Sequence, residues 1–224
     1  MASDRDTTLA LLRAQAEADL RALPDGERRW AHSERVYGLA RRLARQEEAD
    51  RFIVGAAALL HDLPGDDTGD PATRIAAELA LHDLAAPLAG AILDAIAALA
   101  LDDADAASRE AQILRDADRL DDLGALGIAN LLLTGGATDV PLYERDDPFT
   151  LLRPLAPNHV LLDRLYAYLA DLPRQLHTAA ARQIAIRRTG IMLFYLESLR
   201  DELAETIPDA LLPEPDWLVP KEGS

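Results

Sequence analysis

The chain has five histidines, and the residues around them decide which could do chemistry. His61 stands directly before Asp62 at the end of the apolar segment RFIVGAAALLHDL. A mostly buried helix rarely carries two neighbouring ionisable groups without a partner, because burying an unpaired charge is costly. The pair is therefore a candidate site, although a frayed helix end that half-exposes His61 would explain it equally well.

A second polar cluster is the segment RDADRLDDLG, which places four aspartates on one predicted helix. At about 100° per residue, Asp118, Asp121 and Asp122 fall near one face of that helix. A run of charges usually forms a solvated face. Here leucines alternate with the acids, so we expect at least one carboxylate to point inward.

The third feature is His32, in the segment AHSERVYGLA. Arg28 precedes it by four residues and Arg35 follows it by three, so all three side chains share one helix face. An imidazole between two guanidinium groups is a poor proton acceptor, but it could belong to an anion-binding surface. On its own, a single histidine on a helix is more often structural.

Together these features resemble the HD-domain superfamily of metal-dependent phosphohydrolases, which is named for its H…HD…D ligands. HSERVYGLA resembles the family's H-x-x-R-V-x-x-x-A segment, and AALLHDL resembles the segment around its His-Asp pair. RDADRLDDLGALGIA resembles the D-A-D-R-L-D-A-x-G-A-x-G-I-A run of one bacterial branch. That branch also carries a late A-x-x-R-x-x-x-M helix, which matches Ala185, Arg188 and Met192. The resemblance covers residues 30–202.

The resemblance implies one divalent cation, held by His32, His61, Asp62 and Asp118. Two imidazoles and two carboxylates form a mixed nitrogen and oxygen set that suits Mn, Mg, Fe, Co, Ni or Zn. Water on such an ion has a lowered pKa and can attack phosphorus. We therefore expect an HD-type phosphohydrolase for a small phosphorylated metabolite, above all a nucleotide. The bond would be a phosphomonoester or a nucleoside triphosphate pyrophosphate bond.

Other residues are expected to assist at this site. Arg28 and Arg35 could hold phosphate, and Arg35 would stabilise the phosphate charge that develops during the reaction. Arg188 matches the family pattern and could also reach phosphate. Asp66 or Asp67 follows the His-Asp pair and is the nearest substitute for a general acid.

The acids of RDADRLDDLG are assigned unequal roles by the resemblance. Asp118 takes the ligand position, whereas Asp121 is expected to support a ligand or to pack between helices. Asp116 could do the same. If Arg35 instead pairs with Asp121, it only holds two helices together.

Departures from the branch leave other functions open. The chain has Arg28-Arg29 where the branch often has a further His-Asp pair, and AILDAIAALALDD lacks the branch's histidines. These differences favour one metal. They keep a catalytically weak, metal-binding regulatory protein and an HD phosphodiesterase as alternatives, beside a helical interaction module. The second His-Asp pair, His82-Asp83, is interpreted as chance because it lacks a flanking apolar helix.

Composition limits the partners of the chain. The 39 acidic and 23 basic residues give a net charge of −16, which repels nucleic-acid polymers and anionic membrane surfaces. No run reaches the roughly 18 apolar residues of a membrane span, and the first residues lack a signal-peptide pattern. We expect a cytoplasmic protein with a small phosphorylated substrate, and a homodimer is kept open.

The same composition predicts an all-α fold. Hydrophobic residues make up 49% of the 224 but aromatic ones only 4%, and cysteine is absent, so the core is aliphatic. Proline and glycine divide the chain into expected helices near 3–23, 27–48, 51–63, 71–84, from 87, 109–123, 124–133, 161–172 and 175–205. We predict one HD-domain helical bundle over 1–205, with its metal-site core at about 28–135 and covering helices at about 158–205. Residues 206–224 form an extended tail.

Overall fold

The computed structural model describes residues 2–65, 69–82, 84–101 and 108–213, with side chains from residue 4 onward. Every regular element within these ranges is a helix, so the predicted all-α class is confirmed. The described residues include no helix that is both long enough and apolar enough to cross a membrane.

The chain forms two compact units. The first consists of Met1–Asp121 with His177–Ala181, and the second of Asp122–Leu176 with Arg182–Ser224. The single-domain organisation expected from the sequence stays a prediction.

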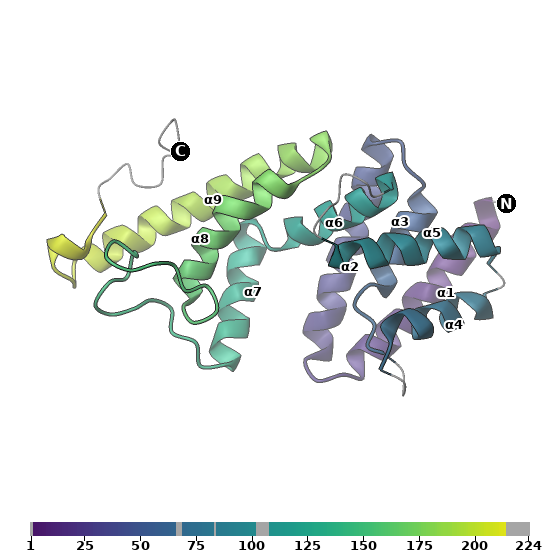
Figure 1. Cartoon of the computed structure of the whole chain (residues 1–224), viewed down its shortest axis with the longest axis horizontal. Helices are drawn as coiled ribbons and strands as arrows, with labels where there is room; N and C mark the ends of the chain where they lie inside the picture. The colour runs from purple at the N-terminus through teal and green to yellow at the C-terminus, as the bar shows by residue number, and fades with distance from the viewer. Residues whose placement is uncertain (1, 66–68, 83, 102–107, 214–224) are drawn as a thin grey trace. The chain divides into compact units, whose positions relative to one another are not determined.

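The first unit is built around one apolar helix (Figure 1). Its helices are α1 (Ala2–Arg21), α2 (Gly26–Gln46), α3 (Arg51–Leu60), α4 (Pro71–Leu81), α5 (Ala86–Ala97) and α6 (Arg109–Asp121). In α3, Phe52 and every residue from 54 to 60 are buried. This helix packs against α1, α2, α5 and α6, because a helix that is apolar nearly all round must be covered on every side.

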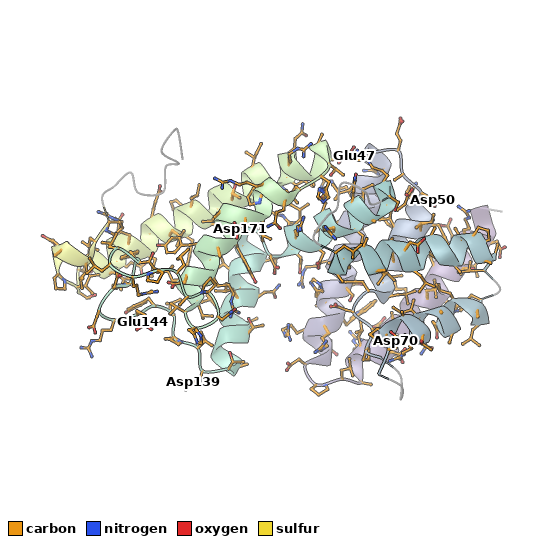
Figure 2. All side chains as sticks on the ribbon, viewed as in Figure 1. Glu47, Asp50, Asp70, Asp139, Glu144 and Asp171 are labelled. Atoms are coloured by element: carbon orange, nitrogen blue, oxygen red, sulfur yellow. The ribbon has the colours of Figure 1, made fainter. Side chains whose placement is uncertain are left out.

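Side-chain caps set the starts of two of these helices. Asp50 accepts hydrogen bonds from the backbone N–H groups of Phe52 and Ile53, at 2.8 and 3.4 Å, before α3. Asp70 caps α4 in the same way, and Pro71 occupies the first turn, where its missing N–H costs nothing. Figure 2 labels both aspartates at these positions. The ends fall slightly short of expectation, since α4 stops at Leu81 rather than near residue 84.

The second unit contains α7 (Gly124–Ala137), α8 (Leu161–Asp171) and the greater part of α9 (Ala179–Ala204). Gly124 has a φ of +84°, and a Cβ added there would lie 3.1 Å from the Arg188 side chain. The start of α7 and α9 therefore approach closely at this glycine.

Gly135 and Gly136 do not end α7, although the sequence predicted that this helix ends near residue 133. The helix continues to Ala137 instead of giving way to a loop at Thr134. Gly135 is buried, and a Cβ on it would lie 2.4 Å from the methyl groups of Leu161. This glycine serves helix packing rather than a turn. A short 3₁₀ turn, Asp209–Leu211, also interrupts the predicted extended tail.

Candidate metal centre

Three packed helices deliver the predicted ligands. His32 lies in the middle of α2, and Asp118 lies on α6. His61 caps the C-terminal end of α3, and Asp62 follows it directly. Because α2 and α6 both pack on α3, the polar end of the central helix faces both.

The four side chains converge on one point. The Nε2 atom of His32 lies 3.3 Å from Asp118 Oδ1 and 3.7 Å from Asp62 Oδ2. The Nε2 atom of His61 lies 3.6 Å from Asp62 Oδ1 and 3.8 Å from Asp118 Oδ1. Ligand atoms of His32, His61 and Asp62 all lie within 4.8 Å of one another. Asp118 is not part of that group, but its Oδ1 approaches both imidazole rings.

Both imidazoles are oriented through their Nδ1 atoms. The Nδ1–H of His61 donates to the carbonyl oxygen of Ala58 at 2.9 Å. The Nδ1 atom of His32 lies 2.8 Å from Asp121 Oδ2. In each ring the Nε2 atom is therefore directed to the cluster, which is the arrangement of histidines that bind metal ions.

One atom of the cluster indicates a missing partner. The His61 side chain is only 4% exposed, and its Nε2 atom has no hydrogen-bond partner among the described residues. Buried polar atoms are nearly always paired, so an unpaired one needs an explanation. A divalent cation held by the cluster would satisfy this atom, and the donor set fits such an ion.

The electrostatics of the cluster favour a positive charge at the same point. Burial lowers the pKa of His32, but hydrogen bonds with Asp118 and Asp121, together with nearby carboxylate charges, raise it to about 10. Burial raises the pKa of Asp121, but hydrogen bonds from Arg35 and His32 lower it to about 2. The raised pKa of His32 shows that the groups around its ring favour a positive charge at this point.

The four acids of the α6 segment separate into different roles. Asp116 is fully buried and accepts hydrogen bonds from the backbone N–H groups of His177 and Thr178 and from the Thr178 hydroxyl. Asp118 faces the cluster, while Asp121 lies behind His32. Asp122 belongs to the second unit. Asp116 and Asp121 could not be ranked from sequence alone, because their partners come from distant segments.

The other predicted site residues lie in different surroundings. Arg28 is exposed and pairs with Asp25 at 3.5 Å. Arg35 is bound to Asp121. Arg188 lies on α9 in the second unit, against Gly124. Asp66 and Asp67 lie outside the described residues. Their proposed roles stay predictions.

The His82 imidazole lies apart from the cluster. It pairs with Glu78 on its own helix at 3.4 Å, and the following residue, Asp83, lies outside the described residues. His82 is absent from the His32, His61 and Asp62 group. This half-buried ion pair suits a structural role.

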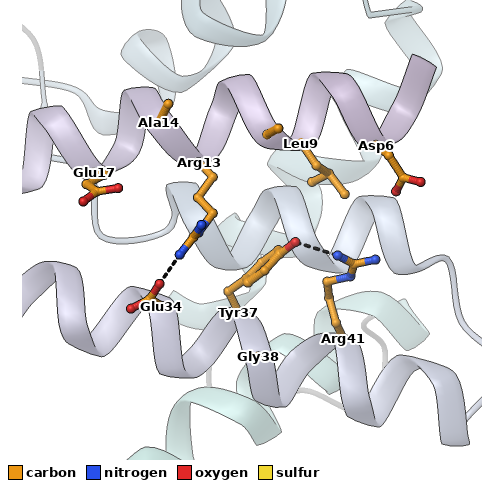
Figure 3. Close-up of a pocket in the computed structure, with 10 residues that line it drawn as sticks. Asp6, Leu9, Arg13, Ala14, Glu17, Glu34, Tyr37, Gly38 and Arg41 are labelled. Carbon is orange, nitrogen blue, oxygen red and sulfur yellow. Dashed lines mark hydrogen bonds and ion pairs between the residues drawn. The ribbon is translucent and has the colours of Figure 1, made fainter. Parts of the chain in front are cut away.

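A groove of about 590 Å³ lies between α1 and α2 (Figure 3). It is lined in part by Tyr37 and Arg41, and Arg41 stands nine residues after His32, about 180° around the helix. The groove is therefore on the face of α2 opposite the cluster. Its charged groups engage one another: Arg13 pairs with Glu34, and Arg41 donates to the Tyr37 hydroxyl at 2.6 Å. No histidine lines it.

Comparison with known proteins shows which proteins this chain resembles. Residues 29–123 match the model of the HD domain. YpgQ of Bacillus subtilis (strain 168) is 28% identical over 183 residues, which cover 78% of this chain and 83% of YpgQ. The crystal structure of YpgQ in complex with ADP has a TM-score of 0.74 at 26% identity, covering 92% of this chain and 98% of that chain.

A second solved structure gives the same result. An HD-superfamily hydrolase from Bacillus thuringiensis has a TM-score of 0.74 at 27% identity, covering 89% of this chain and 98% of that chain. The segment that matches the HD domain contains His32, His61, Asp62 and Asp118, the residues that converge in the first unit. Over most of its length the chain is thus similar to an HD-superfamily hydrolase, and its residues 29–123 match the HD domain itself, which supports a metal-dependent phosphohydrolase of that type.

Proposed function

We propose that the chain hydrolyses a phosphate bond of a small nucleotide with one divalent cation held by His32, His61, Asp62 and Asp118. The observation that carries the metal assignment is the convergence of both Nε2 atoms and both carboxylates on one point. The nucleotide assignment is supported by YpgQ, whose structure was solved in complex with ADP. The bond is a phosphomonoester or a nucleoside triphosphate pyrophosphate bond.

The side chains of the cluster would have different roles at the bound cation. A divalent cation bound there would polarise a phosphoryl oxygen and lower the pKa of its bound water. His61 is the enclosed ligand, at 4% exposed, whereas the Asp62 and Asp118 side chains are 37% and 38% exposed. The carboxylate side of the cluster is therefore open, and the substrate phosphate enters there.

Arginine side chains and an acid complete the proposal. Arg28 is exposed on the helix that carries His32, so it can turn toward a bound phosphate at the cost of a weak surface ion pair. A phosphate contact of Arg188 rests on its match to the family pattern alone. Asp66 or Asp67, in the segment after the His-Asp pair, would give the leaving group its proton.

The test is a screen of nucleoside mono-, di- and triphosphates, a phosphodiester and general phosphatase substrates. Each is incubated with Mn²⁺, Mg²⁺, Co²⁺ or Ni²⁺, and the products are identified. We expect metal-dependent turnover of a nucleotide that His61→Ala abolishes and His82→Ala preserves, since His82 lies outside the cluster. Metal binding without any turnover would contradict the proposal and favour a regulatory protein. Cleavage of the diester alone would favour a phosphodiesterase.

A further inference from the structure

We propose that Asp121 and Arg35 form a buried positioning pair that orients His32 for the cation, and that Arg35 acts through this pair rather than on the substrate. The inference rests on the proposed metal centre. It concerns residues that touch neither the cation nor the reacting atoms, so their effect must pass through His32.

The geometry of Asp121 is the first observation. Its side chain is 1% exposed, and three donors converge on its two oxygens. Oδ2 accepts from Nδ1 of His32 at 2.8 Å and from Nη2 of Arg35 at 2.8 Å. Oδ1 accepts from Nε of Arg35 at 2.7 Å. The guanidinium fork fixes the plane of the carboxylate, and the carboxylate fixes the ring of His32.

The consequence for His32 follows from the chemistry of imidazole. A carboxylate can only accept, so the ring must carry a hydrogen on Nδ1. The neutral ring that binds a cation then has its lone pair on Nε2, which faces Asp62 and Asp118. An acceptor behind the ring therefore selects the tautomer that can ligate.

The geometry of Arg35 ties it to Asp121 and argues against a direct grip on phosphate. The Nε and Nη2 edge of its guanidinium binds both carboxylate oxygens, so a phosphate could use only the remaining N–H groups of Nη1 and Nη2. The positive charge of Arg35 also neutralises the buried Asp121, which would otherwise be costly. Arg35 is thus committed to Asp121.

The spacing on the two helices supports the same pairing. Arg35 follows the ligand His32 by three residues on α2, and Asp121 follows the ligand Asp118 by three residues on α6. Residues three apart share a helix face. Each helix therefore delivers one ligand and, one turn later, one member of the positioning pair.

The first test compares Asp121→Asn with Asp116→Asn. Both acids are buried on α6, but Asp116 bonds to the backbone at His177 and Thr178 and has no contact with His32 among the described residues. An amide has one acceptor oxygen and an NH₂ donor, so Asp121→Asn cannot serve three donors. The readouts are the dissociation constant of Mn²⁺, from the electron paramagnetic resonance signal of the free ion, and the His32 Nδ1–H signal in the Zn²⁺-loaded protein.

We expect Asp121→Asn to weaken Mn²⁺ binding by about 10- to 100-fold and to abolish the protected Nδ1–H signal. Asp116→Asn should lower the melting temperature and leave both readouts at wild-type values. Unchanged Mn²⁺ affinity and an unchanged signal in folded Asp121→Asn would overturn the positioning role. Failure of the wild type to bind Mn²⁺ would instead overturn the proposed metal centre, so the two failures are distinguishable.

The second test uses Arg35→Lys, which keeps the charge beside Asp121 and therefore the fold, but removes the fork. We expect weaker Mn²⁺ binding than in the wild type, with the KM for the nucleotide unchanged once the site is saturated with Mn²⁺. A raised KM with wild-type Mn²⁺ affinity would show that Arg35 contacts the substrate and would overturn its assignment to the pair.

Discussion

At the scale of single residues, the cluster combines one enclosed ligand with two accessible ones. His61 is buried and leaves its Nε2 atom without a partner among the described residues, while Asp62 and Asp118 remain over a third exposed. A bound cation would pair with this ring nitrogen, and the carboxylates could share the ion with substrate and water. Loss of a ligand should therefore act on metal content before it acts on chemistry.

Removal of either residue of the His-Asp pair should empty the site. His61→Ala or Asp62→Ala deletes one of the four proposed ligands, and water in its place would hold the ion more weakly. Elemental analysis of protein purified with Mn²⁺ should show about one ion per wild-type chain and a small residual fraction in either variant. His82→Ala serves as the control. Full occupancy in both pair variants would remove them from the ligand set.

The proposed general acid can be separated from a structural acid by the choice of leaving group. Asp66→Asn or Asp67→Asn should lower kcat for a nucleotide by roughly 10²-fold or more, yet change the hydrolysis of an activated aryl phosphate little, because that leaving group needs no proton. Asp70→Asn is the matched control, since asparagine also caps a helix. Equal losses on both substrates would contradict the assignment.

At the scale of helices, periodicity and caps were sufficient to place most elements. The apolar stretch after Asp50 is the central helix of the first unit, and its polar end carries His61 and Asp62, as its sequence indicates. The order and types of the four proposed ligands were also readable, because they lie in three short motifs, on α2, at the end of α3 and on α6. The rotation of α6 about its own axis could not be predicted from the sequence. This rotation directs Asp118 to the cluster and Asp116 to the segment before α9. It is set by contacts between segments that are far apart in the sequence.

The glycines of α7 show the same limit. A sequence pattern treats Gly135 and Gly136 alike as helix breakers, yet α7 contains both. A Cβ on Gly135 would lie 2.4 Å from the methyl groups of Leu161, whereas a Cβ on Gly136 meets nothing within 4 Å. Only the tertiary structure shows that the first glycine is required for packing and the second is not.

These two glycines make a matched pair for measurement. Gly136→Ala should raise the free energy of unfolding by up to about 1 kcal/mol, because alanine has the higher helix propensity. Gly135→Ala gains the same propensity but must displace the buried Leu161, so we expect a net loss of roughly 1–3 kcal/mol. Urea unfolding of both variants decides the point. A stabilised Gly135→Ala variant would show that α7 and Leu161 are not in tight contact.

At the scale of the whole molecule, the net charge of −16 sets which phosphates can approach. A polymer brings many negative charges over a wide surface, and it gains affinity by releasing counterions to clustered lysine and arginine side chains. This chain has 23 such residues against 39 acids, and several of them, including Arg13 and Arg35, are paired with carboxylates. A mononucleotide needs only the local charge of one cation and a few donors.

The dependence of DNA binding on salt concentration tests this expectation most directly. Fluorescence anisotropy with labelled single-stranded and duplex DNA should detect no micromolar binding in physiological salt. Lowering the salt should not create it, because the Debye length grows and the repulsion between two negative surfaces is less screened. A protein that uses nucleic acid as its substrate behaves in the opposite way and binds more tightly as salt falls. Micromolar binding that strengthens at low salt would require a basic surface large enough to overcome the overall charge, and it would contradict assignment of a small-molecule substrate.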